Sequence, residues 1–496
     1  MGEQSKLLEE MLAQAEMSVE DLGEKVAELE TRQDMVGLEG TILETVLRLG
    51  GTWMGMILSL WAANLAAKAG TRRVCACEGV ARWVELRAKT ILTLFGRVTY
   101  RRVYYHCKQC RHGEALGDRQ WGLEHTRTSP TVKQLLGYVS ASISGFSAAA
   151  SLVCRTLHWS EQWLSGKQVQ RLAEPIGAKL GEAEVRRIAR WWAQVTKGLT
   201  ASLEGKGREA YRELVRRAQE QTSERLYVQM GGIFARLRGE LGKGSDVWRE
   251  VKVGAIFWAE SGRHATKLVE LDGKAAVGSQ QLARTWVDVA KGPITYVAGL
   301  LTAADFGVRV YAEAVIRGVE RAKEAVILGD GALWIWKLAE EHFPGAIQIL
   351  DFWHASEWVW KVAKAVWGEG SAKATLWAET QIAEHLILGD VVGLLAAIAA
   401  LPKVPPPADA KKSLPEQALE LFRNNAKRMR YPEYRARGLE IGSGTVESAG
   451  KRVVGQRCKG PGMRWSEEGL TAILNLRTDV LNDRYDLALA DLQEAA

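Results

Sequence analysis

Two short apolar segments, each leading into a helical pattern, place the strongest constraint on the fold of this chain. They are EAVILGDGALWIW, which begins at Glu324, and AIQILDFWHASEW, which begins at Ala346. Buried strands that run directly into helices are typical of parallel β-sheet. Three β-rich segments precede them, RLYVQMGGIFARLR, EVKVGAIFWAE and ATKLVELDG, and their close spacing predicts consecutive antiparallel strands. Between the two groups we expect a helical region from about Gln281 that includes TYVAGLL.

Three antiparallel strands followed by parallel ones give the strand order of a ribonuclease-H-like sheet. In that sheet the ends of the first and fourth strands lie side by side, and a later helix can present a third group to both. Asp330 follows the fourth strand, and Glu447 is expected in the first turn of a helix capped by Thr445. Paired carboxylates bind Mg²⁺ or Mn²⁺, and two such ions can activate an attacking oxygen on a phosphodiester. The alternative is that Gly-Asp-Gly is a strand-to-turn sequence and that Glu447 favours a helix N-terminus.

Other polar residues bear on this predicted magnesium site. Asp351 follows the next strand and His354 lies three residues later, so both are expected either to face the same pocket or to belong to an aromatic helix with a satisfied histidine. The first strand has Gly231 where a third carboxylate would stand, and a glycine side chain cannot bind metal. The nearby acidic residues do not follow a matching strand; they are Asp246, Glu260 and Asp272.

Four of the six cysteines form two close pairs, Cys75-Ala-Cys77 and Cys107-Lys-Gln-Cys110. The segment between them, ILTLFGRVTYRRVYYH, alternates around a central Phe-Gly and predicts a β-hairpin. A hairpin that brings two such pairs together gives the tetrahedral thiolate site of a zinc ribbon, whereas reduced, unligated thiols are the alternative. The flanking histidines that can substitute as ligands are His106 and His112. The remaining cysteines, Cys154 and Cys458, are expected to be small buried side chains.

The charge distribution suggests a phosphate-rich partner. The chain carries a net charge of +7, yet residues 1–50 hold 12 acidic and 4 basic side chains. Basic residues outnumber acidic ones by 12 to 5 over residues 71–130 and by 11 to 3 over residues 421–464. Lys and Arg that neutralise phosphates supply most of the sequence-independent affinity for nucleic acid. A solvated basic surface is the alternative.

A length of 496 residues exceeds what one hydrophobic core usually supports, and the patterns predict a multidomain α/β chain. The long apolar stretches, such as the one from Met54, are interrupted or too short to span a bilayer, and we expect a cytoplasmic, nucleoid-associated protein with no membrane partner. The predicted segments are an N-terminal helical region (1–70), a zinc-ribbon-like domain (71–125), a helix-turn-helix region (126–200), the first part of a ribonuclease-H-like core (201–357), an all-helical insertion (358–440) and the C-terminal helices of the core (441–496).

Two helices are predicted within residues 126–200, in SGFSAAASLVCRTLH and LSGKQVQRLAEPIGAKL, with Ser165 capping the second. In a helix-turn-helix unit the N-terminal residues of the second helix face base edges in the major groove, whereas a plain helical hairpin makes no such contact. The residues expected to read bases are Lys167, Gln168, Gln170 and Arg171. A basic edge expected to follow the DNA backbone comes after Glu447 and consists of Lys451, Arg452, Arg457, Lys459 and Arg464.

Taken with these motifs, the chain resembles the bacterial ISKra-type insertion-sequence transposases of the Mutator-like DDE group. The resemblance covers roughly residues 70–485 and rests on the cysteine pairs, the FSAAASL and GKQVQR helices, GDGALWIW, DFWHASEW and GSGTVESAGKRVVGQRCKGPGMRW. It implies recognition of inverted-repeat ends and of target DNA, and cleavage and strand transfer with two metal ions. We also expect a homo-oligomer. On this resemblance Asp330 is the second acid, Glu447 the glutamate, and Asp351 with His354 the auxiliary pair.

Two departures from the family pattern lead to two hypotheses. Gly231 replaces the first aspartate, and the first cysteine pair is C-x-C rather than C-x-x-C. The first hypothesis is a DNA transposase with Mg²⁺ or Mn²⁺ in the core and Zn²⁺ in the ribbon, impaired by Gly231. The second is a catalytically inactive remnant that binds DNA as a repressor or as a subunit of mixed assemblies.

Overall fold

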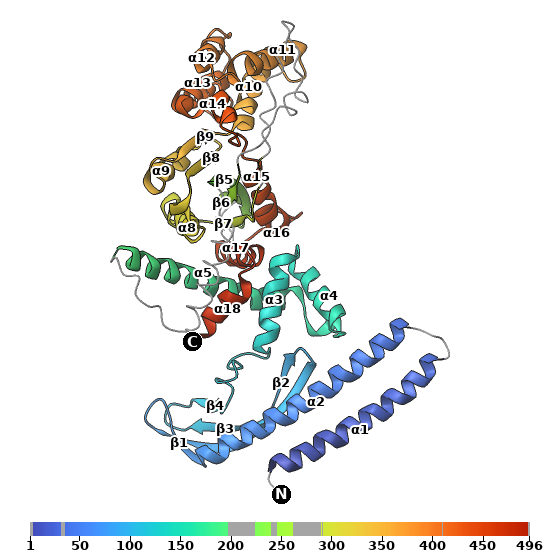
Figure 1. Ribbon diagram of the computed structural model, residues 1–496. Helices are drawn as coiled ribbons and strands as arrows, with labels where there is room; N and C mark the ends of the chain where they lie inside the picture. Colours follow the sequence, from blue (N-terminus) through green and yellow to red (C-terminus); the bar gives the residue numbers. More distant parts are fainter. Residues whose placement is uncertain are drawn as a thin grey trace. The chain divides into compact units, whose positions relative to one another are not determined.

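The chain folds into two compact units, Met1–Ile176 and Gly177–Ala496. The computed structural model, shown in Figure 1, describes residues 3–30, 35–196, 224–239, 246–260, 289, 291–408 and 410–494. The predicted third strand ATKLVELDG, with Asp272, lies outside the described residues, as do residues 201–223 at the start of the predicted core. Within the described part the fold is mixed α/β, with N-terminal helices, one curled antiparallel sheet and one mixed sheet.

Two long helices open the first unit, as their apolar spacing predicts: α1 (Glu3–Glu30) and α2 (Met35–Ala69). They pack side by side, and the Trp53 indole donates a hydrogen bond to the Met11 carbonyl at 3.1 Å. By length and composition alone, α2 is the one helix among the described residues that could cross a membrane, so our prediction that its apolar stretch is too short was wrong on that criterion. A single helix of this kind is weak evidence of a membrane span, because a helix of a soluble protein can pass the same test.

The predicted β-hairpin is confirmed as the centre of a four-stranded antiparallel sheet. Strand β2 (Val80–Thr93) pairs with β3 (Gly96–Cys107) over nearly its whole length, and short strands β1 (Arg72–Val74) and β4 (Gly113–Ala115) complete the order β1-β2-β3-β4. The tight turn between β2 and β3 holds Gly96 at a φ of 90°, a left-handed conformation that glycine adopts without steric cost. The hairpin therefore brings both cysteine pairs to one end of the sheet.

Three helices follow this sheet and share one small core. They are α3 (Pro130–Ser142), α4 (Phe146–Thr156) and α5 (Gly166–Thr196). Cys154 is buried in that core, as predicted, together with Val153 and Val169. The predicted cap at Ser165 is confirmed, because its hydroxyl accepts the backbone N–H of Gln168 at 3.3 Å.

The second unit is built on a five-stranded sheet with the order β7-β6-β5-β8-β9. Strands β5 (Arg225–Leu237), β6 (Val247–Ala259) and β7 (Thr295–Gly299) are antiparallel neighbours, whereas β8 (Glu324–Gly329) and β9 (Ile347–Leu350) run parallel to β5. The predicted strands at Asp330 and Asp351 are therefore confirmed. The prediction for TYVAGLL was wrong, since Thr295–Gly299 is the third antiparallel strand. That short segment is buried on every residue, so its apolar run suits a strand as well as a helix.

Helices cover both faces of this sheet (Figure 1). A side chain at Gly254 of β6 would meet Phe306 and Val310 of α8 (Ala303–Ile316), whereas one at the neighbouring position Gly231 would meet Val446 of α15 (Gly444–Gly450). Gly231 lies opposite Val253 in the β5–β6 register, so α8 and α15 pack on opposite faces. On the α8 side lies α9 (Leu333–His342), and α17 (Glu467–Leu481) packs beside β7.

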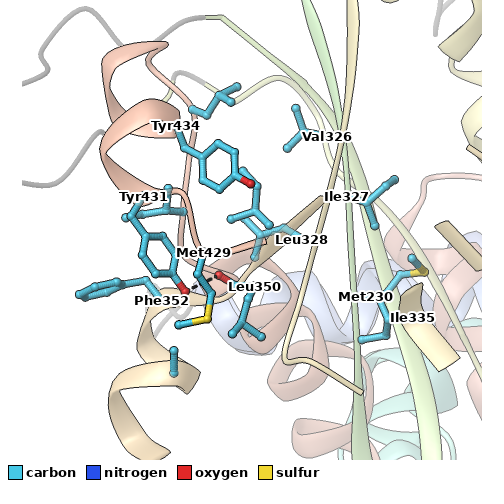
Figure 2. Close-up of a cluster of buried hydrophobic side chains, with 14 of the residues drawn as sticks. Met230, Val326, Ile327, Leu328, Ile335, Leu350, Phe352, Met429, Tyr431 and Tyr434 are labelled. Carbon is cyan, nitrogen blue, oxygen red and sulfur yellow. Dashed lines mark hydrogen bonds between the residues drawn. The ribbon is translucent and has the colours of Figure 1, made fainter. Parts of the chain in front are cut away.

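The remaining helices confirm the helical pattern predicted between Trp358 and Glu440. They are α10 (Phe352–Trp367), α11 (Ala372–Gln381), α12 (Val391–Ala399), α13 (Leu414–Asn425) and α14 (Tyr431–Ala436). Two further helices lie beyond that range: α16 (Gln456–Cys458) follows α15, and α18 (Tyr485–Glu494) follows α17. Figure 2 shows how α14 closes over the parallel strands. The Tyr431 hydroxyl donates to the Leu350 carbonyl at 3.1 Å and Tyr434 to Gln348 at the same distance. Burial raises the pKa of Tyr431 well above its usual value and also raises the pKa of Tyr434, so both hydroxyls remain donors.

Two glycines allow α5 to approach α17 within the second unit. A Cβ on Gly177 would lie 2.1 Å from the carbonyl oxygen of Ala472, and one on Gly181 would lie 2.2 Å from the Asn475 amide nitrogen. The same amide donates a hydrogen bond to the Gly177 carbonyl at 3.1 Å. A side chain at Gly177 must therefore separate the helices, whereas one at Gly181 must displace the Asn475 side chain and its hydrogen bond.

We expect Gly177→Ala to lower the stability of the second unit by about 1–3 kcal/mol, because the added methyl overlaps backbone rather than a movable side chain. The midpoint of thermal unfolding, followed by circular dichroism, should fall by several degrees. Lys179→Ala, on the exposed side of the same helix, is the matched control and should leave the midpoint unchanged. An unchanged midpoint for Gly177→Ala would contradict this close approach.

Candidate metal-binding sites

The four paired cysteines come together at the end of the first sheet. Their sulfur atoms all lie within 4.8 Å of one another, and the Cys75–Cys110 and Cys77–Cys107 separations are 3.5 and 3.7 Å. A zinc–sulfur distance of about 2.3 Å gives sulfur–sulfur separations of roughly 3.8 Å in a tetrahedron. The geometry therefore fits a tetrahedral metal ion, and these four residues can hold a metal such as zinc.

Backbone N–H groups favour a thiolate in this cluster. The N–H of Cys110 is the main cause that lowers the pKa of the Cys107 thiol to about 7, desolvation opposes it, and the N–H of Gln109 adds to the lowering. A metal ligand must be the thiolate, so this environment assists binding. His106 and His112, the alternative ligands, are absent from the cluster that the described residues form. The C-x-C spacing is accommodated because the loop places Glu78 at a φ of 65° and lets the Cys75 N–H bond the Gly79 carbonyl.

The second candidate site lies at the end of the mixed sheet. Met230 of β5 pairs with Gly329 of β8, so the next residue of each strand, Gly231 and Asp330, continue side by side. The helix that carries Glu447 reaches the same place, since a side chain at Gly231 would lie 3.7 Å from Val446. The structure thus gathers the three predicted positions at one strand end. Asp330 is half-buried and accepts the Ala332 N–H at 3.0 Å, and Glu447 is exposed.

The start of α15 is fixed by hydrogen bonds that the sequence did not reveal. The helix begins two residues earlier than predicted, at Gly444, with Ser443 at the cap position in place of Thr445. Thr445 instead accepts Lys291 at 2.7 Å, and the same ammonium contacts the Glu440 carboxylate at 2.7 Å. The buried Gln229 of β5 accepts the Val446 N–H at 3.0 Å and donates to Glu440 at 3.1 Å. Glu447 is therefore positioned by its neighbours rather than by flexible glycines.

Gln229 and Lys291 are the residues that sequence reasoning missed. The signal for Gln229 was present, because a glutamine inside the apolar run LYVQMGGIF must find hydrogen-bond partners when it is buried. Lys291 carries no such local signal, since its partners lie about 150 positions further along the chain.

Asp351 joins this strand end to the helical part of the unit. Its carboxylate caps α10 by accepting the Trp353 N–H at 2.8 Å, and it also accepts the Ser443 hydroxyl. Burial raises the pKa of Asp351 to about 6, and the nearby Glu447 carboxylate acts in the same direction. His354 lies on the next turn, where its Nε2 accepts the Trp358 indole N–H at 3.1 Å. Asp351 and His354 therefore belong to α10, and each has a local partner.

The carboxylates at this strand end do not form a closed ligand set. Among the described residues, the four cysteines are the one group of three or more His, Cys, Asp or Glu side chains arranged to hold a metal. Neither described substitute supplies the missing acid: Asp246 pairs with Arg236 at 2.7 Å beyond the far end of β5, and Glu260 follows the opposite end of β6. Of the predicted magnesium ligands, Asp330 and Glu447 are the two that the structure places at this strand end.

The predicted DNA-contacting residues divide into exposed and structural ones. Lys167, Arg171, Lys451, Arg452, Lys459 and Arg464 are exposed. The prediction for Arg457 was wrong, since it is 1% exposed and its guanidinium lies over the Trp465 ring. Gln168 is exposed but completes a capping box, in which its side-chain oxygen accepts the Ser165 N–H at 2.8 Å. Gln170 is half-buried and donates to Glu174 at 2.7 Å, so both glutamines have structural partners.

We expect the full-length protein, purified without chelator, to contain about one zinc ion per chain. Cys107→Ser should remove most of this zinc and lower the midpoint of thermal unfolding, because the metal links the segment before β2 to the end of β3. Cys154→Ala changes a buried cysteine outside the cluster and should retain the metal. Elemental analysis reads both outcomes, and a wild-type protein without metal would refute the site.

We expect the stability of the metal-free protein to depend on pH through Asp351. A pKa raised in the folded state contributes stability that is present below the unfolded pKa of about 4 and is lost as pH rises through about 6. Asp351→Asn keeps an acceptor for the Trp353 N–H without the charge, so it should gain on the order of 2 kcal/mol relative to wild type between pH 4 and pH 8.

Asp390→Asn is the matched control for this pH effect. Asp390 also caps a helix, but the Gly393 N–H and then His385 lower its pKa, so this variant should lose stability relative to wild type as pH rises. Thermal unfolding in the presence of chelator measures both. A constant difference between Asp351→Asn and wild type across this pH range would contradict the burial of the charge.

Comparison of the chain with protein-family models found no match, and comparison with curated proteins found none either.

Proposed function

We propose that this chain is a DNA transposase of an insertion sequence, with cleavage and strand transfer weakened by Gly231. The observation that carries the proposal is the meeting of Gly231 in β5, Asp330 just after β8 and the Glu447 helix where the parallel pairing of β5 with β8 ends. The strand order β7-β6-β5-β8-β9 supports a ribonuclease-H-like core, in which this strand end is the place for metal-dependent phosphodiester chemistry. The helices α10 to α14, between β9 and α15, correspond to the expected insertion.

Asp330 and Glu447 would hold a divalent ion in this core. Hard carboxylate oxygens suit Mg²⁺ or Mn²⁺, and such an ion supplies activation of an attacking oxygen and charge stabilisation. Neither carboxylate forms an ion pair with a described residue, so both remain available. Lys291 and Gln229 hold the α15 N-terminus against β5, and thereby keep Glu447 near the strand end.

The first unit supports the DNA-binding part of the proposal. Helices α3, α4 and α5 enclose one core, as in a helix-turn-helix unit, and the exposed Lys167 and Arg171 lie in the first turns of α5. A side chain at Gly166 would lie 2.7 Å from the Ser147 backbone nitrogen, so α4 and the start of α5 are closely packed. The four-cysteine sheet, with zinc as its metal, precedes this unit in the manner of a zinc ribbon. Lys and Arg in these positions favour a phosphate backbone.

A second candidate is favoured by the surroundings of Gly231. Its φ is not positive, and the nearest atom to an added Cβ would be 3.7 Å away, which is ordinary contact. Glycine is therefore not required here by the backbone or by packing. A chain that has lost an acid from a permissive position can be a remnant that binds DNA without cutting it, as a repressor or a subunit of mixed assemblies.

A nicking assay distinguishes the two candidates. The substrate is a supercoiled plasmid that carries the DNA flanking this reading frame, incubated with Mg²⁺ or Mn²⁺. The proteins are wild type, Gly231→Asp, and Asp330→Ala in each background. Restoring a bridging carboxylate should raise the cleavage rate by about 100-fold or more. Asp305→Ala, an exposed acid on α8, is the control for loss of negative charge.

The cleavage results distinguish the transposase from the DNA-binding remnant. Cleavage by wild type that disappears with Asp330→Ala supports the transposase, whereas cleavage by the Gly231→Asp protein alone supports the remnant. Equal cleavage by all proteins would remove the site assignment. DNA binding by fluorescence anisotropy should be the same for wild type and the core variants, and no binding at low salt would refute both candidates.

A further inference from the structure

The two outer edges of the β2–β3 hairpin differ in how far neighbouring elements cover them. On the β3 side, helix α2 and the loop after β4 cover the strand: the Arg101 N–H donates to the Ser59 hydroxyl at 3.0 Å, and the Val103 carbonyl accepts the Leu116 N–H at 3.4 Å. On the β2 side, β1 pairs only with residues 80–82. Beyond that, the described contacts of this edge are Thr71 with Trp83, and Arg127 and Ser129 with Leu92.

The uncovered part of the β2 edge presents backbone hydrogen-bonding groups. The backbone N–H and C=O of Leu92 both form hydrogen bonds on that outer edge. Because the register from Glu85 to Thr93 is regular, the backbone N–H and C=O groups of Ala88 and Leu86 also point to the outer edge. The Arg101 contact agrees with this, because Arg101 lies opposite Ala88 and directs its N–H away from β2. No described residue pairs with the backbone of this outer edge between residues 84 and 88.

Large apolar side chains accompany these free backbone groups. Trp83, Val84 and Leu86 are 47, 50 and 55% exposed, and none of them belongs to a hydrophobic core cluster of the described residues. An exposed edge strand with apolar side chains is a template for pairing with another strand. We propose that the chain forms a two-fold dimer in which β2 pairs antiparallel with β2 of a second copy, with Leu86 opposite Leu86 at the axis. This dimer does not rest on the proposed function.

The charged side chains on β2 favour a second copy of this strand as the partner, and they favour one pairing register. With Leu86 at the axis, Glu85 of each copy lies opposite Arg87 of the other, and these non-hydrogen-bonded positions bring side chains closest. A shift to the neighbouring registers places Arg87 opposite Arg87, Arg87 opposite Lys89, or Glu85 opposite Glu85. Each of those pairs like charges, which destabilises a strand pair. The first of these registers also places Glu85 opposite Lys89, but the Lys89 side chain is 9% exposed and its ammonium already pairs with Asp118 at 2.9 Å, so it does not offset the repulsion between the two Arg87 side chains. The segment Glu85-Leu86-Arg87 is thus complementary to itself in one register.

The Glu85 and Arg87 side chains are available for this exchange. They form an ion pair within the chain at 2.6 Å, and both are about half exposed, at 50 and 46% of their side-chain surface. The Arg87 guanidinium also lies over the Tyr104 ring at 3.7 Å, which holds it beside the edge. A strand pair of this length is at the small end of specific interfaces, so we expect an association that depends on protein concentration.

Disulfide trapping in the full-length protein tests the register. Leu86→Cys should form an intermolecular disulfide under mild oxidation, because directly opposite hydrogen-bonded residues lie about 5.5 Å apart at their Cα atoms. Ala88→Cys is the matched control on the same face and should link far less. Peptide mass spectrometry identifies the linked cysteines, since Cys110 is also exposed. Leu86→Cys linkage no greater than in wild type, or equal Ala88→Cys linkage, overturns the proposal.

A charge exchange tests the complementarity by sedimentation equilibrium. Glu85→Arg and Arg87→Glu each place two like-charge pairs in the dimer and should raise its dissociation constant by about tenfold or more. The double variant restores two opposite-charge pairs and should return close to wild type. Circular dichroism checks that each variant is folded. A wild-type monomer, a dimer that neither single change weakens, or a double variant that remains monomeric overturns the proposal.

Discussion

The parallel pairing of β5 with β8 is the interaction on which the candidate core site depends. These strands are separated by almost 100 positions in the chain, as the Arg225–Glu324 pair at their first residues shows. Their register places Gly231 and Asp330 at the same level, and the helix that carries Glu447 packs beside Gly231. Without this pairing, Asp330 is one acidic residue in a Gly-Asp-Gly turn. With it, the residue stands beside a position where an acid would complete a metal site.

A hydrogen-bonded group around Glu440 fixes the start of α15 relative to β5. Glu440 is 7% exposed, and its carboxylate accepts hydrogen bonds from Gln229 and Lys291. Its backbone N–H donates to the Tyr227 hydroxyl. A buried carboxylate is costly unless it is paired and hydrogen-bonded, so this group must form together. It joins β5 to the segment just before α15. The position of Glu447 therefore depends on polar residues that belong to none of the predicted functional motifs.

Local patterns predicted much of the fold because local physics decides those elements. The hairpin between the cysteines, the strands ending at Asp330 and Asp351, and the helices of the insertion all follow from periodicity and turn residues. Thr295–Gly299 was missed because a five-residue buried strand has no alternation. The cap of α15 and the burial of Arg457 were missed because both depend on distant partners, Gln229 in one case and Trp465 in the other. The cysteine cluster was predictable as a whole, since a hairpin fixes which residues meet at its open end.

The space beside Gly231 also has an electrostatic consequence for the proposed core site. A complete set of three carboxylates at one strand end repels itself until a cation binds, and such a site makes folding partly dependent on metal. This chain has a hydrogen atom where the third negative charge would stand, and the remaining acids, Asp330 and Glu447, reach the strand end from different elements. On the proposed function, this strand end therefore carries less repulsion before a cation binds, and it holds the cation less tightly than three carboxylates would.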